Sequence, residues 1–157
     1  MGKIKSVLFV CTGNSCRSVM AEGFMKKYLR ELGKADIEVL SAGISAAEGF
    51  FPTAETIEVM SQEGVDVSGL RSKNLTLRMI EGADIILAME DIHMNYITRL
   101  MPSAASKTHL LKAYPDEIQL TFPENHNIPD PIGRPMEYYQ LAAAVIKDQV
   151  KRIAEIL

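Results

Sequence analysis

Cys11 and Arg17 stand six positions apart in a short polar stretch, and their types and spacing are suited to chemistry on an anion. An apolar run at residues 5–11, typical of a buried strand, leads into this stretch, and an amphipathic helical pattern follows from residue 18. A thiol at such a junction faces the partial positive charge of the helix N-terminus, which favours the thiolate. Cys11 is therefore a candidate nucleophile.

The residues around this pair indicate what the thiolate would attack. Arg17 can fold back over the loop and offer two N–H groups to two oxygens of a tetrahedral anion. Backbone N–H groups around Gly13 can converge on the same anion, whereas the glycine patterns of dinucleotide and nucleoside-triphosphate sites are absent. Ser18 can donate a hydrogen bond to the thiolate, and Asn14 and Ser41 are candidates to brace the loop. The pattern favours phosphoryl transfer through a cysteinyl-phosphate.

Cleavage of a phosphate ester also requires a proton donor for the departing oxygen, and the same group can later activate water. Asp130 is the favoured donor, because Pro129 and Pro131 stiffen the backbone on both sides and hold its carboxylate away from any helix. Three other carboxylates of the same proline-rich segment are less firmly fixed competitors: Asp116, Glu117 and Glu124.

The elements that must position these residues alternate between strand and helix, which predicts an α/β fold. Such alternation implies right-handed crossovers and a parallel sheet with helices on both faces, so we expect three layers in a single domain over residues 1–157. The most apolar strands, near residues 7–10 and 85–87, should be central. We predict strands at residues 5–11, 37–42, 84–89 and 108–113, helices at 18–32, 53–63, 72–83, 91–100 and 136–157, and loops at 44–52 and 114–135.

Composition and charge narrow the classes of protein to which the chain can belong. With 157 residues, 47% of them hydrophobic, it has the length and apolar content of one globular domain. Seventeen basic against twenty acidic residues, a net charge of −3, argue against a partner that is nucleic acid or an anionic membrane. No apolar run approaches the roughly 20 residues that span a bilayer, and the first run is too short for a signal peptide, so we expect a cytoplasmic protein.

The cysteine loop and its surroundings resemble the low-molecular-weight protein-tyrosine phosphatases. The similarity covers residues 7–18 with their C-x5-R-S pattern, residues 21–22, 41–43 and 83–89, and Asp130-Pro131, in order along nearly the whole chain. It implies that Cys11 is the nucleophile, Arg17 the phosphate clamp and Asp130 the general acid and base. The same resemblance implies a four-stranded parallel sheet in the order 2-1-3-4, a phosphorylated protein or peptide as substrate, inorganic phosphate as product, and no metal or other cofactor. The remaining loop residues would line the phosphate site, with Ser41 in support: Thr12, Gly13, Asn14, Ser15, Cys16 and Ser18.

Two positions keep the substrate class open. Phosphotyrosine-directed members often carry a large apolar residue where Ser15 stands, and aromatic residues after the Asp-Pro pair, where this chain has Ile132 and Gly133. A small hydroxyl residue at the Ser15 position is similar instead to the protein-arginine phosphatases of the same fold. Phe50 and Phe51 are candidates for a wall against an aromatic substrate ring, or for loop residues that pack onto the core. We expect phosphotyrosine hydrolysis, with phosphoarginine hydrolysis as the alternative.

Two other functions fit the residues less well. Thioredoxin-coupled arsenate reductases begin with a similar loop, but their chemistry needs further cysteines, and none follows Cys16. A non-catalytic oxyanion-binding module would not require Cys11, Arg17, Ser18 and Asp130 together.

The remaining notable residues are interpreted as protective or structural. Cys16 matches a family cysteine that can close a reversible disulfide with the nucleophile under oxidising conditions. His93, His109 and His126 stand singly, as surface or helix-end histidines do, and residues 138–139 are interpreted as surface and core tyrosines of the last helix. Two cysteines without paired histidine spacing do not predict a zinc site.

Overall fold

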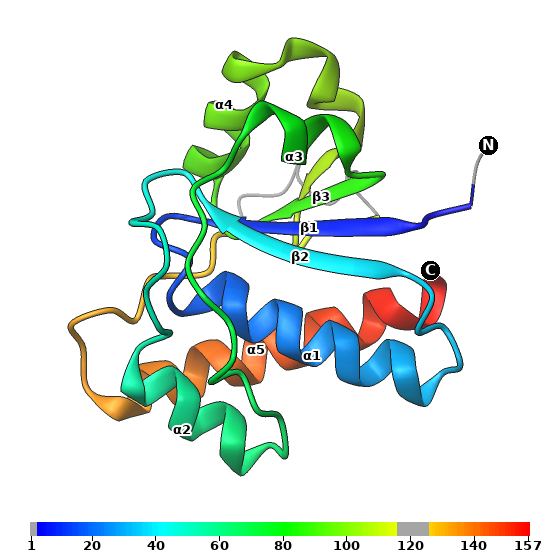
Figure 1. The fold of residues 1–157 in the computed structure, drawn as a ribbon. Coiled ribbons are helices and arrows are strands. Elements are labelled where there is room, and N and C mark those ends of the chain that lie inside the picture. The colour runs from blue at the N-terminus through cyan, green and yellow to red at the C-terminus, as the bar shows by residue number, and fades with distance from the viewer. Residues whose placement is uncertain (1–2, 116–125) are drawn as a thin grey trace.

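A four-stranded parallel sheet forms the centre of the computed structural model, which describes residues 3–115 and 126–157 (Figure 1). Its strands are β1 (Ser6–Cys11), β2 (Glu38–Gly43), β3 (Ile85–Ala88) and β4 (Thr108–Leu110). They lie in the order β2-β1-β3-β4, and every neighbouring pair is parallel. The expected α/β class and strand order are confirmed, and the two most apolar strands, β1 and β3, occupy the middle of the sheet.

Helices cover both faces of the sheet, because β1 and β3 bury side chains on both sides. On one face, Phe9 and its neighbours pack under α1 (Arg17–Glu31), α2 (Ala54–Gln62) and α5 (Met136–Ile156). On the other face, Leu8 and Val10 pack under α3 (Leu77–Gly82), α4 (Asp91–Leu100) and the short 3-10 helix η1 (Pro102–Lys107). Figure 1 shows the resulting three layers, with α1, α2 and α5 below the sheet and α3 and α4 above it.

Two predicted boundaries are wrong. The helix expected over residues 72–83 is only α3, because the Thr76 side chain accepts a hydrogen bond from the Met79 N–H at 3.2 Å and so begins the helix later. The residues before it run extended past the end of β2, where the Gly43 N–H donates to the Lys73 carbonyl at 2.9 Å. The strand expected over 108–113 ends at Leu110, because the chain turns back there and the Tyr114 N–H donates to the Leu110 carbonyl.

Parallel strands bring their carboxyl ends to one edge of the sheet, and this edge carries the cysteine loop. Cys11 pairs with Gly43 in the β1–β2 register, so the loop after β1 lies directly against the end of β2. A Cβ atom on Gly43 would stand 2.4 Å from the Thr12 carbonyl oxygen, far inside van der Waals contact. Glycine at this position therefore allows the loop to approach β2, and the side chains that follow β1, β2 and β3 meet at one place.

Candidate active site

Cys11 is the last residue of β1, and the loop is wrapped around its sulfur. Its Sγ accepts a hydrogen bond from the Asn14 N–H at 3.3 Å and lies 2.9 Å from Ser18 Oγ. Asn14 adopts the left-handed conformation, with a φ of 52°, which asparagine tolerates better than most residues and which turns the chain back toward the sulfur. The predicted anion-binding loop is thus folded around the predicted nucleophile.

A buried chain of hydrogen bonds determines which atom donates in the hydrogen bond between Ser18 Oγ and Cys11 Sγ. The Asn14 side-chain Nδ2 donates to Ser18 Oγ at 2.8 Å and to Ser41 Oγ at 2.9 Å. Ser41 Oγ in turn donates to the buried Glu22 carboxylate at 2.6 Å. Because Ser18 Oγ accepts from Asn14, its own proton is available for the sulfur of Cys11. Asn14 and Ser41, the two residues predicted to brace the loop, make these contacts, whereas the contact of Glu22 was not foreseen.

Arg17 is the first residue of α1 and is almost completely buried, with a side chain 1% exposed. Its Nη1 donates to Glu90 Oε2 at 2.5 Å and to the Ile128 carbonyl at 2.7 Å. Its Nη2 lies 3.4 Å from Thr12 Oγ1 and 3.5 Å from Asp130 Oδ2. One side of the guanidinium is therefore anchored in the protein, which holds the other side toward the cysteine loop and the predicted acid.

Asp130 lies in the loop before α5, and its carboxylate approaches Arg17 and the cysteine loop. Its side chain is 36% exposed, and its Oδ1 accepts a hydrogen bond from the Ile132 N–H at 3.0 Å, which fixes the carboxylate within its own turn. The competitors Asp116, Glu117 and Glu124 lie outside the described residues.

Most of the residues predicted to form the active site line one cavity of about 160 Å³. Its walls come from the cysteine loop, from the first residue of α1 and from the Asp130 turn. The lining residues are Cys11, Thr12, Gly13, Ser15, Cys16, Arg17, Asp130 and Ile132. Asn14 and Ser18 were also predicted to contact substrate, but they do not line the cavity. Both are buried, and their side chains are hydrogen-bonded to each other.

Two further residues beside the cysteine loop, Glu90 and His93, were not predicted from the sequence. His93 was expected to be a surface or helix-end residue, and it does lie in the first turn of α4, but it is completely buried. The Glu90 N–H donates to its Nδ1 at 3.0 Å, so the ring proton resides on Nε2, which donates to Thr12 Oγ1 at 2.9 Å. Glu90 follows β3 at the same sheet edge as the cysteine loop, and this position is the signal that could have identified both residues.

Burial, followed by the nearby positive charge of Arg17, lowers the pKa of His93 to about 4. Between this value and the ordinary histidine pKa of about 6.5, the unfolded chain binds a proton that the native chain does not. The free energy of unfolding should therefore fall as the pH falls through this window. From pH 7 to pH 5 we expect His93 to contribute a loss of about 2 kcal/mol.

Urea denaturation of the wild type and of His93→Asn at pH 7 and pH 5 checks this expectation. The other titrating groups are common to both proteins, so the wild type should lose about 2 kcal/mol more than the variant. Equal losses would show that His93 does not stay neutral in the folded protein.

Cys16 differs from Cys11 in its surroundings. Its Sγ lies 3.6 Å from Ser15 Oγ and 3.6 Å from Thr53 Oγ1, and burial raises the pKa of its thiol. Both cysteines are free thiols in this structure. The expected disulfide between them remains a prediction.

The aromatic candidates separate into core and surface residues. Phe50 and Phe51 are 64% and 62% exposed, so neither packs onto the core, and neither lines the cavity beside Cys11. The Arg71 guanidinium instead lies over the Phe51 ring, 3.7 Å from its centroid. Tyr139 is buried and Tyr138 is exposed, as expected for residues of the last helix.

The parts of the chain that the structure describes show neither a metal-binding cluster nor a membrane-spanning helix. Among residues 3–115 and 126–157, no group of three or more histidine, cysteine, aspartate or glutamate side chains is arranged to hold a metal ion. Within the same ranges, no helix has the length and apolar character needed to cross a membrane.

Comparisons with known proteins agree with this geometry. A probable low molecular weight protein-tyrosine-phosphatase, EpsP, of Ralstonia solanacearum is 33% identical over 92% of this chain and 90% of its own length. A protein-arginine-phosphatase of Geobacillus stearothermophilus is 35% identical over 96% of this chain and 95% of its own length. The crystal structure of the low molecular weight protein tyrosine phosphatase from T. tengcongensis superimposes with a TM-score of 0.85 at 38% identity, covering 97% of this chain and 99% of the other. The family model for low molecular weight phosphotyrosine protein phosphatases matches residues 6–157, and the chain belongs to this family of cysteine-dependent phosphatases.

Proposed function

We propose that this protein removes phosphate from phosphorylated proteins or peptides in two steps, with Cys11, Arg17 and Asp130 as the catalytic residues. The proposal is carried by one observation: a free thiol, a buried guanidinium and a partly exposed carboxylate line the same small cavity. Inorganic phosphate is the released product.

In the first step the Cys11 sulfur forms a bond to phosphorus while the ester bond breaks. Asp130 gives its proton to the leaving oxygen, and Arg17 with the loop N–H groups stabilises the charge on the other phosphoryl oxygens. In the second step Asp130 takes a proton from water, the water oxygen bonds to phosphorus, and the sulfur leaves as a thiolate. The hydrogen bond from Ser18 at 2.9 Å stabilises that thiolate both before attack and on departure.

Phosphotyrosine is the proposed substrate class. Ile132, which follows the Asp130 turn, lines the catalytic cavity and is 53% exposed, so it can contact the ring of an aromatic phosphate ester. The deep position of Arg17 also suits a long, flat side chain that reaches a recessed phosphate.

Phosphoarginine is the second candidate, and Ser15 is the observation that favours it. This small hydroxyl residue lines the catalytic cavity. A larger apolar side chain there would contact an aromatic ring better, whereas serine leaves room for a polar guanidino group. The protein-arginine-phosphatase relative at 35% identity supports the same possibility.

Steady-state kinetics on two peptides of one sequence, carrying phosphotyrosine or phosphoarginine, test this choice. We expect a higher kcat/KM for the phosphotyrosine peptide, and we expect Ser15→Ile to increase the ratio of the two values by about tenfold through apolar contact with the ring. Ser15→Thr is the matched control that keeps the hydroxyl. A wild-type preference for phosphoarginine would reverse the substrate assignment without changing the catalytic residues.

We also infer that the protein works in the cytoplasm. The mechanism requires Cys11 as a free thiol, and Cys16 stands five residues away in the same loop. A reducing compartment keeps such a pair reduced.

A further inference from the structure

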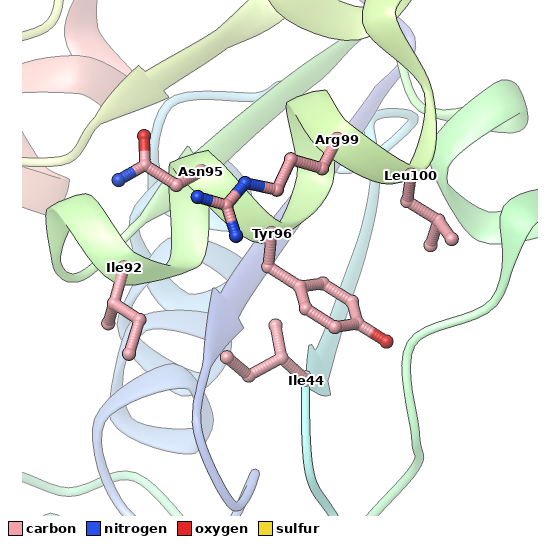
Figure 2. A pocket seen from close by; sticks show the side chains of 6 residues that line it. All are labelled: Ile44, Ile92, Asn95, Tyr96, Arg99 and Leu100. Atoms are coloured by element: carbon pink, nitrogen blue, oxygen red, sulfur yellow. The ribbon is translucent and has the colours of Figure 1, made fainter.

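His93 is a buried polar side chain of α4 that contacts the cysteine loop. Figure 2 shows Ile92, Tyr96 and Leu100 projecting from the same helix, and each of these three side chains is partly exposed in a surface groove. His93 is instead completely buried, and its Nε2 lies 2.9 Å from Thr12 Oγ1. The helix α4 therefore holds one polar ring against the loop that forms the proposed phosphate site.

The backbone at the start of α4 determines the role of each nitrogen of this ring. The Glu90 N–H donates to Nδ1 at 3.0 Å, so the proton of the neutral ring is on Nε2 and is donated to Thr12 Oγ1. Burial keeps the ring neutral, because it lowers the pKa of His93 to about 4. His93 thus acts as a fixed, uncharged hydrogen-bond donor to Thr12.

The hydroxyl of Thr12 accepts two hydrogen bonds and still has its own proton to donate. The second bond comes from Arg17 Nη2 at 3.4 Å. A hydroxyl has two acceptor lone pairs and one proton, and within residues 3–115 and 126–157 no third partner takes the proton of Thr12. Thr12 and Arg17 both line the cavity beside Cys11. The proton is therefore available to an anion that the guanidinium binds in this cavity.

We propose that the Thr12 hydroxyl donates a hydrogen bond to a phosphoryl oxygen of the substrate, and that His93 is the residue that positions this hydroxyl. The inference rests on the proposed phosphatase function and adds a neutral donor to the charged clamp, Arg17. Because Nε2–H of His93 and the guanidinium occupy the acceptor positions of the hydroxyl, its proton cannot turn toward either of them. The donor is oriented before substrate binds, which makes its contribution larger.

Kinetics and phosphate binding of two Thr12 variants test the role of the hydroxyl. Thr12→Val keeps the shape of the side chain and removes the donor. Since hydrogen bonds to charged groups are the stronger ones, kcat/KM for para-nitrophenyl phosphate should fall about 10- to 100-fold. The dissociation constant of inorganic phosphate, measured by isothermal titration calorimetry, should rise at least about fivefold. Thr12→Ser keeps a hydroxyl and should stay within about threefold of the wild type in both measurements.

Two substitutions of His93 separate its contact with Thr12 from its contact with Glu90. The side-chain oxygen of asparagine can replace Nδ1 as the acceptor of the Glu90 N–H, but asparagine is too short to reach Thr12. The longer glutamine can place an amide donor near the position of Nε2. We expect His93→Asn to lower kcat/KM at least about fivefold, and His93→Gln to stay within about threefold of the wild type.

A double-mutant cycle distinguishes positioning from general damage to the fold. If His93 acts through the Thr12 hydroxyl, His93→Asn should cost less than about twofold in the Thr12→Val background, whereas independent losses would multiply. Thr98→Val is the matched control on α4, because the Thr98 hydroxyl donates to the Met94 carbonyl of its own helix at 3.0 Å. This control should leave kcat/KM and phosphate affinity unchanged.

Circular dichroism confirms the fold of each variant, and the two Thr12 variants decide the role of the hydroxyl even if His93→Asn does not fold. Losses that multiply in the cycle, or a Thr12→Val variant with wild-type kcat/KM and phosphate affinity, would overturn the inference. Phosphate binding requires no turnover. A chain that hydrolyses no phosphopeptide, but binds phosphate more weakly after Thr12→Val, would therefore contradict only the proposed phosphatase function.

Discussion

Replacing Cys11 with serine is expected to abolish turnover of para-nitrophenyl phosphate and of phosphopeptides. A serine hydroxyl remains protonated at neutral pH and is a poor leaving group, so the phosphorylated enzyme, if formed, could not release phosphate. Asn14, Arg17 and Ser18 remain in place in this variant, and inorganic phosphate should still bind. Release of nitrophenolate followed by absorbance measures the first effect, and isothermal titration calorimetry measures the second.

Cys16→Ser is the matched control for this experiment. Cys16 makes only long contacts to Ser15 and Thr53, at 3.6 Å each, and the mechanism assigns it no bond to phosphorus. We expect it to retain most of the wild-type kcat. If Cys11→Ser kept substantial turnover, or if Cys16→Ser lost it entirely, the nucleophile would have been assigned to the wrong sulfur.

Replacing Asp130 with alanine should have the second-largest effect. General acid catalysis contributes about 10²–10⁴-fold in rate, so kcat should fall by a factor in this range while KM changes little. The loss should increase with the basicity of the leaving group, because a poor leaving group depends most on the proton that Asp130 donates. A series of aryl phosphates with phenols of increasing pKa measures this dependence.

Asp130→Asn separates the chemical from the structural role of this residue. Its amide oxygen can still accept the hydrogen bond that the Ile132 N–H now gives to the carboxylate, but the side chain cannot donate an acidic proton. Both variants should therefore show the same leaving-group dependence. A loss of less than about threefold in both would exclude Asp130 as the acid, since that is far below the contribution of such a group.

The parts of the site that could be predicted from the sequence are those formed by residues close together in the chain. A strand ending in Cys11, a polar loop and a helix starting near Arg17 are consecutive in the chain, so their relative positions follow from short-range geometry. The order of the strands depended on the family resemblance, because pattern alone indicates that strands are parallel but not which of them are neighbours.

The long-range contacts of the site could not be predicted in the same way. Thr12 and His93 are 81 positions apart, and Arg17 and Glu90 are 73 positions apart, so these hydrogen bonds exist only after the sheet has formed. The local sequence around a single histidine in an amphipathic helix does not show whether its side chain is buried and donates a hydrogen bond, as that of His93 does, or lies at the surface. The late start of α3, after Thr76, had a local signal in the threonine cap, but the chain before it is held extended by hydrogen bonds with Gly43.

Identification of the phosphorylated residue tests the central claim most directly. The Asp130→Ala variant should be mixed with a phosphotyrosine peptide, quenched with acid within milliseconds to seconds, digested and sequenced by mass spectrometry. Fragmentation separates Cys11 from Cys16 within their common peptide. We predict a phosphoryl group on the sulfur of Cys11 and none on Cys16, with an amount that rises and decays at the rate of turnover. A phosphoryl group on any other residue, or product formation by this variant without a phosphorylated enzyme, would contradict the mechanism.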